Sequence, residues 1–366
     1  MKKYISVYVK GDRNSSSYYR FYQYFDLLNG VDVRYRIMYP KWVETRFSPV
    51  GQQPFIIKVL VYIVAYFRML ISLIEDAIQK PDSIVVSRRI INKFMPTHFK
   101  WFFSYILSKG AFFIWDYDDH ILEGKEITKK DFVFFAKKAN CIFVTHEYLK
   151  NLVPHKFIDK VHLLPTTDGD MYKEGKSQLI HDERLRSFNN QLNLVWVAYS
   201  INLEHLRTVI PALDKAASQI KNKHVVLHVV CDKPLEETTE NLIVNNIKWE
   251  KNIAIDTMRK AHIGIMPLKP SEYSKGKGGF KLVQYISIGL PCIASNVGYN
   301  RAVIGDNECG ILVDSPEGWC DAVLRFSDLV VWNEYSSQAY NRWNKYFSFE
   351  NNLRIWENVL DSHKIE

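Results

Sequence analysis

Three carboxylates and one imidazole stand close together in the stretch WDYDDH, residues 115–120. Asp116 and Asp118 form a D-x-D, a spacing in which two carboxylates can hold a divalent metal ion. The same groups could instead act as acid or base, orient a hydroxyl group, or cap the element that follows. The elements around the stretch decide between these roles.

A second group of chemically capable residues lies in the stretch KGKGGFKLVQY, residues 275–285. We expect a helix to begin at Gly278 and Gly279, where adjacent glycines let the backbone approach a ligand closely. A helix start attracts anions, and Lys277 and Lys281 could neutralise a diphosphate bound there. The stretch is neither a P-loop nor a dinucleotide-binding turn, because it lacks their glycine spacing. An ordinary helix start is the alternative interpretation.

Strand-like apolar runs alternate with helical segments along the whole chain, which predicts an α/β protein with parallel sheets covered by helices. Both halves show this alternation, so each half resembles a doubly wound, Rossmann-like domain. The expected strands are residues 4–9, 31–38, 83–88, 111–116, 140–145, 161–165, 192–198, 224–230, 246–249, 261–268, 291–295 and 310–314.

The length of 366 residues exceeds one ordinary core and suits two domains of roughly 150–200 residues each. Residues 166–190 are polar and lack strong periodicity, so we expect the linker there. The predicted organisation is an N-terminal domain at 1–185, a C-terminal domain at 186–345, and a terminal helix at 346–366.

The net charge of +8 lies entirely in the first half, where Lys and Arg minus Asp and Glu give 28 − 20 = +8 for residues 1–185. The same count gives 20 − 20 = 0 for residues 186–366. A basic half indicates an anionic partner, either a membrane or a phosphate-bearing substrate, unless it is simply a solvated face. Nucleic acid is disfavoured as a partner, because no nucleic-acid module and no dense Lys/Arg run is present.

The five cysteines are odd in number and widely spaced, without a C-x-x-C. This pattern predicts neither a disulfide framework nor a zinc site, and it favours a reducing, cytoplasmic compartment. The N-terminus MKKYISVYVKGD reads as a first core strand instead of a signal peptide, because Lys10 interrupts its short apolar stretch.

Residues 54–79 form a strongly apolar segment whose longest uninterrupted run, 59–67, is bounded by Lys58 and Arg68. A spanning helix needs about 20 apolar residues, so the segment is better interpreted as an amphipathic helix with a wide apolar face. Such a helix either packs on the domain core or lies on a bilayer as a peripheral membrane contact.

The runs HIGIMPL, KGKGGFKLVQYISIGLPCIASNVGYN and NECGILV, in this order, resemble the donor-binding half of GT-B fold glycosyltransferases of the family 4 type, glycosyl transferases group 1. The stretch LNLVWVAYSINLEHLRTVIPAL is similar to the opening of the same domain. In residues 1–185 the resemblance is one of layout and of an S-x-x-Y-Y-R turn, and is weaker.

This resemblance implies two Rossmann-like domains facing a cleft, with a C-terminal helix that crosses back toward the first domain. The second domain would bind a UDP-, GDP- or TDP-sugar, and the first a glycan, glycolipid or glycoprotein acceptor. Family members retain the anomeric configuration without a metal or other cofactor. The setting would be surface polysaccharide or glycoconjugate biosynthesis at the cytoplasmic face of the cell membrane.

The sequence departs from the family at its pair of glutamates, whose places fall at Gly276 and Gln284. Gln284 can still donate to and accept from ribose hydroxyls. The Arg/Lys pair common after the first strand of the donor domain is also not evident. These departures keep a second interpretation open, a non-catalytic GT-B partner or glycan-binding subunit of a transferase complex.

Trp249 follows a short strand, where it would either stack on the nucleobase or fill the core, and strand ends in doubly wound folds bind ligands. The expected donor-binding residues are Tyr199, Ser200, Trp249, Lys277, Gly278, Gly279, Phe280, Lys281 and Gln284.

The resemblance changes the interpretation of the D-x-D at Asp116 and Asp118, because in a GT-B enzyme the second domain holds the donor phosphates. No metal site is expected, and the remaining alternatives are an acceptor site or carboxylates paired with nearby arginines. The expected acceptor-binding residues are Ser17, Arg20, Arg88, Asp116 and His120. The expected catalytic residues are Asp118, Asp119 and Lys281.

Overall fold

The computed structural model describes residues 2–13, 15–48, 50–174 and 177–362. The chain divides into two units, the first made of 1–166 with 350–366 and the second of 167–349. All but the first residue of the predicted linker, 166–190, therefore lies in the second unit. It carries two helices, α8 (Gly169–Glu174) and α9 (Ser177–Phe188), instead of an extended connection.

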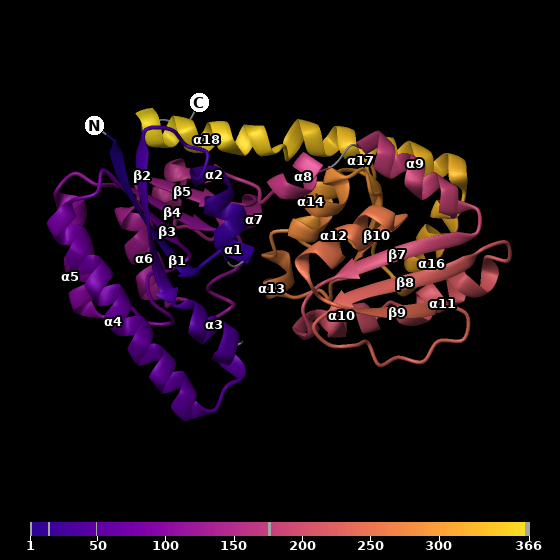
Figure 1. Cartoon of the computed structure of the whole chain (residues 1–366), viewed down its shortest axis with the longest axis horizontal. Helices are drawn as coiled ribbons and strands as arrows, with labels where there is room; N and C mark the ends of the chain where they lie inside the picture. The colour runs from indigo at the N-terminus through magenta and orange to yellow at the C-terminus, as the bar shows by residue number, and fades with distance from the viewer. Residues whose placement is uncertain (1, 14, 49, 175–176, 363–366) are drawn as a thin grey trace. The chain divides into compact units, whose positions relative to one another are not determined.

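The first unit is built on a six-stranded sheet in the order β2-β1-β3-β4-β5-β6, with every neighbouring pair parallel (Figure 1). The order reverses between β1 and β3, so the carboxyl ends of these two strands flank the switch point. The strands are β1 Lys3–Gly11, β2 Val31–Tyr39, β3 Ser83–Ser87, β4 Phe112–Tyr117, β5 Cys141–Val144 and β6 Val161–Leu163.

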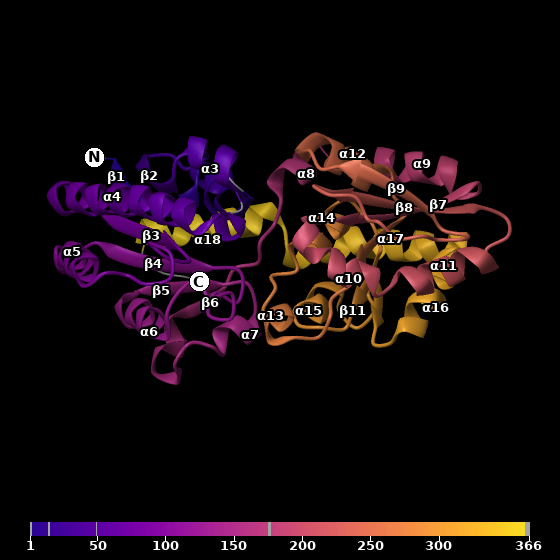
Figure 2. The ribbon, with the colours of Figure 1, turned by 90° about the horizontal axis from the view of Figure 1, so that it is seen from below.

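Helices cover both faces of this sheet. Side chains of α4, α5 and α6 pack on one face with Trp115 and Tyr117, and Figure 2 shows these helices beside the strands. The helical segments of the first unit are α1 Ser15–Ser17, η1 Tyr18–Tyr22, α2 Gln23–Phe25, α3 Lys41–Phe47, η2 Val50–Gln52, α4 Phe55–Gln79, α5 Thr97–Ser108, α6 Lys129–Lys138, α7 Glu147–Lys150, η3 His155–Lys160 and α18 Phe349–Ser362.

The last helix, α18, packs on the other face of the same sheet. Trp356 is fully buried, with its ring centroid 5.8 Å from that of Phe21 and 4.9 Å from those of Phe25 and Phe143. The Asn352 side chain donates to the carbonyl oxygen of Pro165 at 2.7 Å. Helix α18 thus packs into the core of the first unit.

The second unit has another parallel six-stranded sheet, in the order β12-β11-β10-β7-β8-β9. Its strands are β7 Gln191–Val197, β8 His224–Cys231, β9 Ile243–Lys248, β10 Ile263–Met266, β11 Cys292–Ser295 and β12 Gly310–Val313. Its other helical segments are η4 Ser200–Asn202, α10 Leu203–Arg207, α11 Ile210–Gln219, α12 Lys251–Lys260, α13 Glu272–Lys275, α14 Phe280–Ser287, α15 Asn300–Ile304, α16 Pro316–Phe326 and α17 Leu329–Tyr346.

The predicted α/β class with two Rossmann-like sheets is confirmed, because each expected strand overlaps one observed strand. The inner strands were recognisable because their apolar side chains are buried on both faces, as in β7, where six consecutive residues are buried. The edge strands β2 and β9 are more exposed.

Candidate functional site

The order of strands in the second unit reverses between β7 and β10, which are neighbours in the sheet. Ligands of doubly wound sheets bind beyond the carboxyl ends of the strands at such a switch point. The two chain segments that follow β7 and β10 carry most of the predicted donor-binding residues. The site is therefore built around these two segments.

The glycine turn begins helix α14 as predicted. Gly279 is its N-cap and has a φ of +60°, a conformation that residues with a Cβ adopt only with strain. A Cβ on Gly279 would also lie 3.2 Å from side-chain atoms of Tyr299 and Val303. The helix is fixed beneath this turn because Leu282 and Tyr285 are fully buried. A rigid helix start is thus held at the carboxyl end of β10.

The two predicted phosphate-binding lysines are oriented by amide oxygens. Lys277 donates to Asn202 Oδ1 at 2.6 Å, which joins the segment after β10 to the segment after β7. Lys281 donates to Gln284 Oε1 at 2.8 Å. Lys275, by contrast, forms an exposed pair with Glu272. Both ammonium groups lie beside the start of α14 and are held there by neutral amides, an arrangement suited to bind an anion.

Asp168 is a residue that the sequence analysis missed. Its Oδ2 accepts a 2.7 Å hydrogen bond from Gln284 Nε2, so Gln284 links it to Lys281. Its Oδ1 caps the following helix by accepting from the backbone N–H groups of Asp170 and Met171 at 3.0 and 3.2 Å. An Asp just before a helical segment is an N-cap signature, and that signal was available in the sequence.

Burial shifts the pKa values of Asp168 and Lys281, the two ionisable groups that Gln284 links. Burial raises the pKa of Asp168, an effect that the hydrogen bond from Gln284 opposes. Burial lowers the pKa of Lys281 to about 8, while the nearby Asp168 acts in the opposite direction. An anion bound at the start of α14 would restore the full charge of Lys281, because a negative neighbour favours the ammonium form.

An aromatic pair stands beside the same switch point. The ring centroids of Tyr199 and Trp249 are 5.6 Å apart, and Tyr199 is 51% exposed. Ser200 is held by Asp232, which accepts from its backbone N–H at 2.6 Å and from its hydroxyl at 2.8 Å. Burial alone would raise the pKa of Asp232, but these bonds lower it. The two rings are tilted by 38° to one another, and the exposed ring of Tyr199 offers an apolar surface suited to a nucleobase.

In the first unit, Arg20 and Asp116, two of the predicted acceptor-binding residues, form a buried ion pair with each other. Both side chains are 1% exposed, and Arg20 binds both carboxylate oxygens of Asp116. Arg20 also donates to the carbonyl oxygen of Leu164 at 2.6 Å. The two charges satisfy each other across 96 residues of sequence, so neither is presented to a ligand.

The remaining carboxylates of the WDYDDH stretch surround Arg88. This arginine donates to Asp118 Oδ1 at 2.6 and 2.9 Å, to Asp119 Oδ2 at 2.7 Å and to Glu126 Oε1 at 2.9 Å. Burial alone would lower the pKa of Arg88, but Asp118 and Asp119 raise it. This is the arginine pairing that the sequence left open. Asp118 and Asp119 remain partly exposed, so their catalytic role stays a prediction.

Ser17 and His120 occupy turn positions. The Ser17 hydroxyl donates to the carbonyl oxygen of Gly11 at 2.9 Å and is buried. His120 Nδ1 accepts from the backbone N–H of Glu123 at 3.3 Å, and the residue is 7% exposed. Both side chains are buried and bond to nearby backbone atoms, and their acceptor role stays a prediction.

Within the described ranges, no group of three or more His, Cys, Asp or Glu residues is arranged to hold a metal ion. The D-x-D carboxylates are instead engaged by Arg20 and Arg88.

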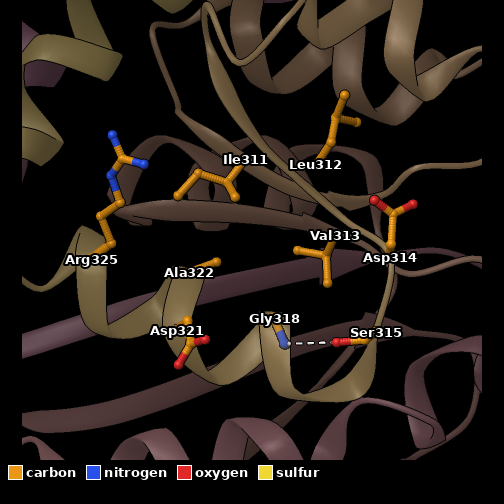
Figure 3. A pocket seen from close by; sticks show the side chains of 9 residues that line it. All are labelled: Ile311, Leu312, Val313, Asp314, Ser315, Gly318, Asp321, Ala322 and Arg325. Carbon is orange, nitrogen blue, oxygen red and sulfur yellow. Dashed lines mark hydrogen bonds between the residues drawn. The ribbon is translucent and has the colours of Figure 1, made fainter.

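Figure 3 shows a pocket between β12 and α16, away from the predicted donor residues. Its lining includes two carboxylates, Asp314 and Asp321, beside a single cation, Arg325. Ser315 in its wall already caps α16 by accepting from the backbone N–H of Gly318 at 3.3 Å. Because the carboxylates would repel phosphate, this pocket does not compete with the glycine turn as a diphosphate site.

The chain resembles known proteins both in the segment that carries this site and in its fold. Residues 193–328 match the family model Glycosyl transferases group 1. A glycosyltransferase from Rickettsia africae is similar in structure, with a TM-score of 0.64 and 12% identity over 98% of this chain and 99% of that chain. HepE from Anabaena in complex with UDP has a TM-score of 0.67 and 10% identity over 98% of this chain and 100% of that chain. Sucrose-phosphate synthase from Thermosynechococcus elongatus has a TM-score of 0.63 and 11% identity over 99% of each chain. No curated protein sequence matches the chain.

The match at 193–328 covers β7 to α16, including the switch point and the glycine turn at the start of α14. At identities this low the solved structures show the fold alone, whereas the family match concerns the segment that carries the site. The second unit thus contains a glycosyl transferases group 1 domain, and the chain is a glycosyltransferase with the GT-B fold.

Proposed function

We propose that this glycosyltransferase moves a sugar from a nucleoside-diphosphate donor to a hydroxyl group of a glycan, glycolipid or glycoprotein. The observation that carries the proposal is the meeting of Lys277, Lys281 and the Gly278–Gly279 turn at the switch point of the second sheet. Two ammonium groups and a helix start together complement a diphosphate. No comparable set of cations surrounds the pocket of Figure 3.

The nucleoside is placed by the aromatic pair. With the diphosphate at the start of α14, the base stacks on the exposed ring of Tyr199, which follows β7 and is supported by the ring of Trp249, which follows β9. The Anabaena relative was solved with UDP, which supports a uridine nucleotide as the first donor to test. GDP- and TDP-sugars are the other candidates.

In the reaction, the bond between the anomeric carbon and the diphosphate oxygen breaks while the acceptor oxygen bonds to that carbon. The acceptor hydroxyl loses its proton, and the leaving diphosphate gains negative charge. Lys277, Lys281 and the backbone N–H groups at the start of α14 stabilise this charge where it develops. Retention of configuration and independence from metal are proposed from the family resemblance.

On the acceptor side, Asp118 and Asp119 are the proposed groups that orient the hydroxyl or accept its proton. Arg88 holds both carboxylates in place through hydrogen bonds. Surface polysaccharide or glycoconjugate biosynthesis in the cytoplasm is the proposed setting. The five cysteines, all free and buried, suit a reducing compartment.

The test is calorimetric titration of UDP, GDP, TDP and their sugars into the wild-type protein and into Lys281→Ala. We expect one nucleotide class to bind and Lys281→Ala to weaken its binding by about 10- to 100-fold, the loss of one charge-assisted hydrogen bond. Lys275→Ala is the matched control, because its lysine lies nearby but forms an exposed pair with Glu272. The absence of binding by every nucleotide would contradict the proposal.

One observation favours a second candidate, a non-catalytic donor-binding partner. Gly276 and Gln284 stand where the family carries glutamates, and Gln284 is engaged by Asp168 and Lys281. Such a partner would bind the nucleotide with the same dependence on Lys281. It would show no sugar transfer or donor hydrolysis with acceptor extracts, which distinguishes it from the enzyme.

A further inference from the structure

Helix α4 carries two separate apolar faces. Its inner face, Val61, Ala65, Met69 and Leu73, is at most 2% exposed and packs into the core of the first unit. A second apolar row recurs every three or four residues, which places it on one side of the helix. This outer row is 38–74% exposed and consists of Ile56, Leu60, Ile63, Phe67, Ile71, Ile74 and Ile78.

Helix α5 and the residue segment before it extend this row. Phe94 and Trp101 are 55% and 62% exposed, and the Trp101 ring stacks on that of Tyr105 with centroids 6.0 Å apart. The two helices lie side by side in Figures 1 and 2, and the ring centroids of Tyr66 in α4 and Phe99 in α5 are 5.2 Å apart. We call the outer row of α4 together with Phe94, Trp101 and Tyr105 the outer apolar face.

The sequence around the outer apolar face carries an excess of positive charge. Residues 41–109 contain ten Lys or Arg and four Asp or Glu, a balance of 10 − 4 = +6. Of the four acids, Asp76 is buried and Glu75 pairs with Arg36. Between 45 and 74, and again between 83 and 109, the sequence holds no carboxylate at all. Three of the ten cations pair with carboxylates of later segments, Arg88 and Arg89 with Glu126 and Lys100 with Asp131. The remaining Lys and Arg residues, among them Lys58, Arg68, Lys93 and Lys109, leave an excess of positive charge beside the exposed apolar side chains.

Helix α4 is fixed to its sheet by a buried acid near its end. Asp76 accepts hydrogen bonds from the hydroxyls of Tyr4, Ser6 and Tyr8 at 2.8, 2.5 and 2.6 Å, and it pairs with Arg36. A helix that crossed a bilayer would leave these partners and bury Asp76 in hydrocarbon, which is costly. The outer face can therefore meet a membrane only with the helix still packed on the sheet.

By length and composition alone α4 could cross a membrane, and 22% of its most apolar window is buried. Of the described helices it is the one that meets these criteria. A helix whose inner side belongs to a protein core and whose outer side is apolar fits the interface between lipid head groups and acyl chains.

We propose that the outer apolar face binds an anionic lipid bilayer, with α4 lying parallel to the surface. Its isoleucines and Phe67 enter the head-group region, Trp101 and Tyr105 lie at the boundary, and the surrounding Lys and Arg residues contact lipid phosphates. A second copy of the chain is a poorer occupant, because it would bring two positively charged faces together. The proposal is independent of the donor site.

The test uses the full chain and sedimentation with vesicles of phosphatidylcholine containing about 30% phosphatidylglycerol, compared with phosphatidylcholine alone. We expect binding to the anionic vesicles that weakens as salt is raised from about 0.1 to 1 M, where the Debye length falls to about 3 Å. The double variant Leu60→Gln, Phe67→Gln should bind at least about ten-fold more weakly, because it removes two inserted apolar side chains.

The matched control is Ile243→Gln, Val330→Gln, which removes two exposed apolar side chains of the second unit, 48% and 77% exposed. It should bind vesicles like the wild type. Unfolding curves in chemical denaturant that match the wild type verify that both double variants are folded.

Equal binding by the two double variants would overturn the proposal. Protein that resists extraction from the vesicles at alkaline pH would indicate a spanning helix. A dimer that Leu60→Gln, Phe67→Gln dissociates, without any vesicle binding, would identify a second copy as the occupant.

Discussion

At the scale of single residues, the donor side depends on how Lys281 is placed beside Gln284. A glutamate at position 284 would form an ion pair with Lys281 and compete with a diphosphate for it. The glutamine amide orients the ammonium group through a 2.8 Å hydrogen bond without neutralising it. Asp168 in turn fixes the amide, so that its oxygen faces Lys281 and its nitrogen faces the carboxylate. The departure from the family pattern therefore preserves a cation for the donor phosphates.

The titration of Lys281 predicts a pH dependence of donor binding. Burial lowers its pKa to about 8 in the free protein, so the ammonium form is lost as pH rises through that value. A bound diphosphate favours the ammonium form and raises the pKa, so binding takes up a proton and weakens above about pH 8. Affinity for the nucleotide sugar should be flat below about pH 7 and fall by up to ten-fold for each pH unit above about 8.

Calorimetry across this range checks the expectation, with Lys281→Arg as the control. Arginine keeps its charge at every pH used, so this variant should bind with little pH dependence. The same decline in Lys281→Arg would assign the titration to another group.

At the scale of elements, the turn before α14 requires glycine for two separable reasons. The first is backbone conformation, since an alanine at φ +60° costs about 1–2 kcal/mol. The second is space, since a Cβ would lie 3.2 Å from Tyr299 and Val303. We expect Gly279→Ala to destabilise the second unit by more than the conformational cost alone and to weaken nucleotide binding.

Gly30→Ala provides the comparison for this prediction. Gly30 has a φ of +75°, but no atom lies within 4 Å of a Cβ built there, so only the conformational cost applies. Chemical denaturation of the two variants measures the difference. An equal loss of stability in both would show that Tyr299 and Val303 move aside.

The twelve strands and the glycine turn could be predicted because their signals are local: continuous apolar runs and adjacent glycines before a helix. Helix α9 could not, because it is held by polar contacts. Arg184 is 1% exposed and donates to the carbonyl oxygens of Arg259 and Ile288 at 2.8 and 3.0 Å. A segment anchored by side chain–backbone hydrogen bonds lacks the apolar periodicity of a helix and reads as a linker.

The pairing of the acceptor-side charges was hidden for a different reason. Arg20 and Asp116 lie in separate segments, and only the fold reveals that they neutralise each other. Asp116 lies near the carboxyl end of β4 and Arg20 in the helical segment that follows β1, positions that do not distinguish a ligand contact from a buried ion pair. Their burial decides for the ion pair.

At the scale of the whole molecule, the end of the chain belongs to the unit that its beginning builds. Trp356 of α18 contacts Phe21, Phe25 and Phe143, all of the first unit. We expect Trp356→Ala to destabilise that unit by about 3–5 kcal/mol, because it empties a large buried site. Hydrogen exchange with mass spectrometry should show faster exchange in the first unit only.

Trp332→Ala supplies the mirror experiment, because Trp332 is equally buried but lies in the core of the second unit and donates to the carbonyl oxygen of His262 at 2.7 Å. This variant should accelerate exchange in residues 191–313 and leave residues 3–25 and 141–144 unchanged. Donor binding separates the two further: Trp356→Ala should retain nucleotide affinity, since the donor residues belong to the other unit, whereas Trp332→Ala should weaken it. Faster exchange across both units in either variant would contradict the division of the chain at residue 166.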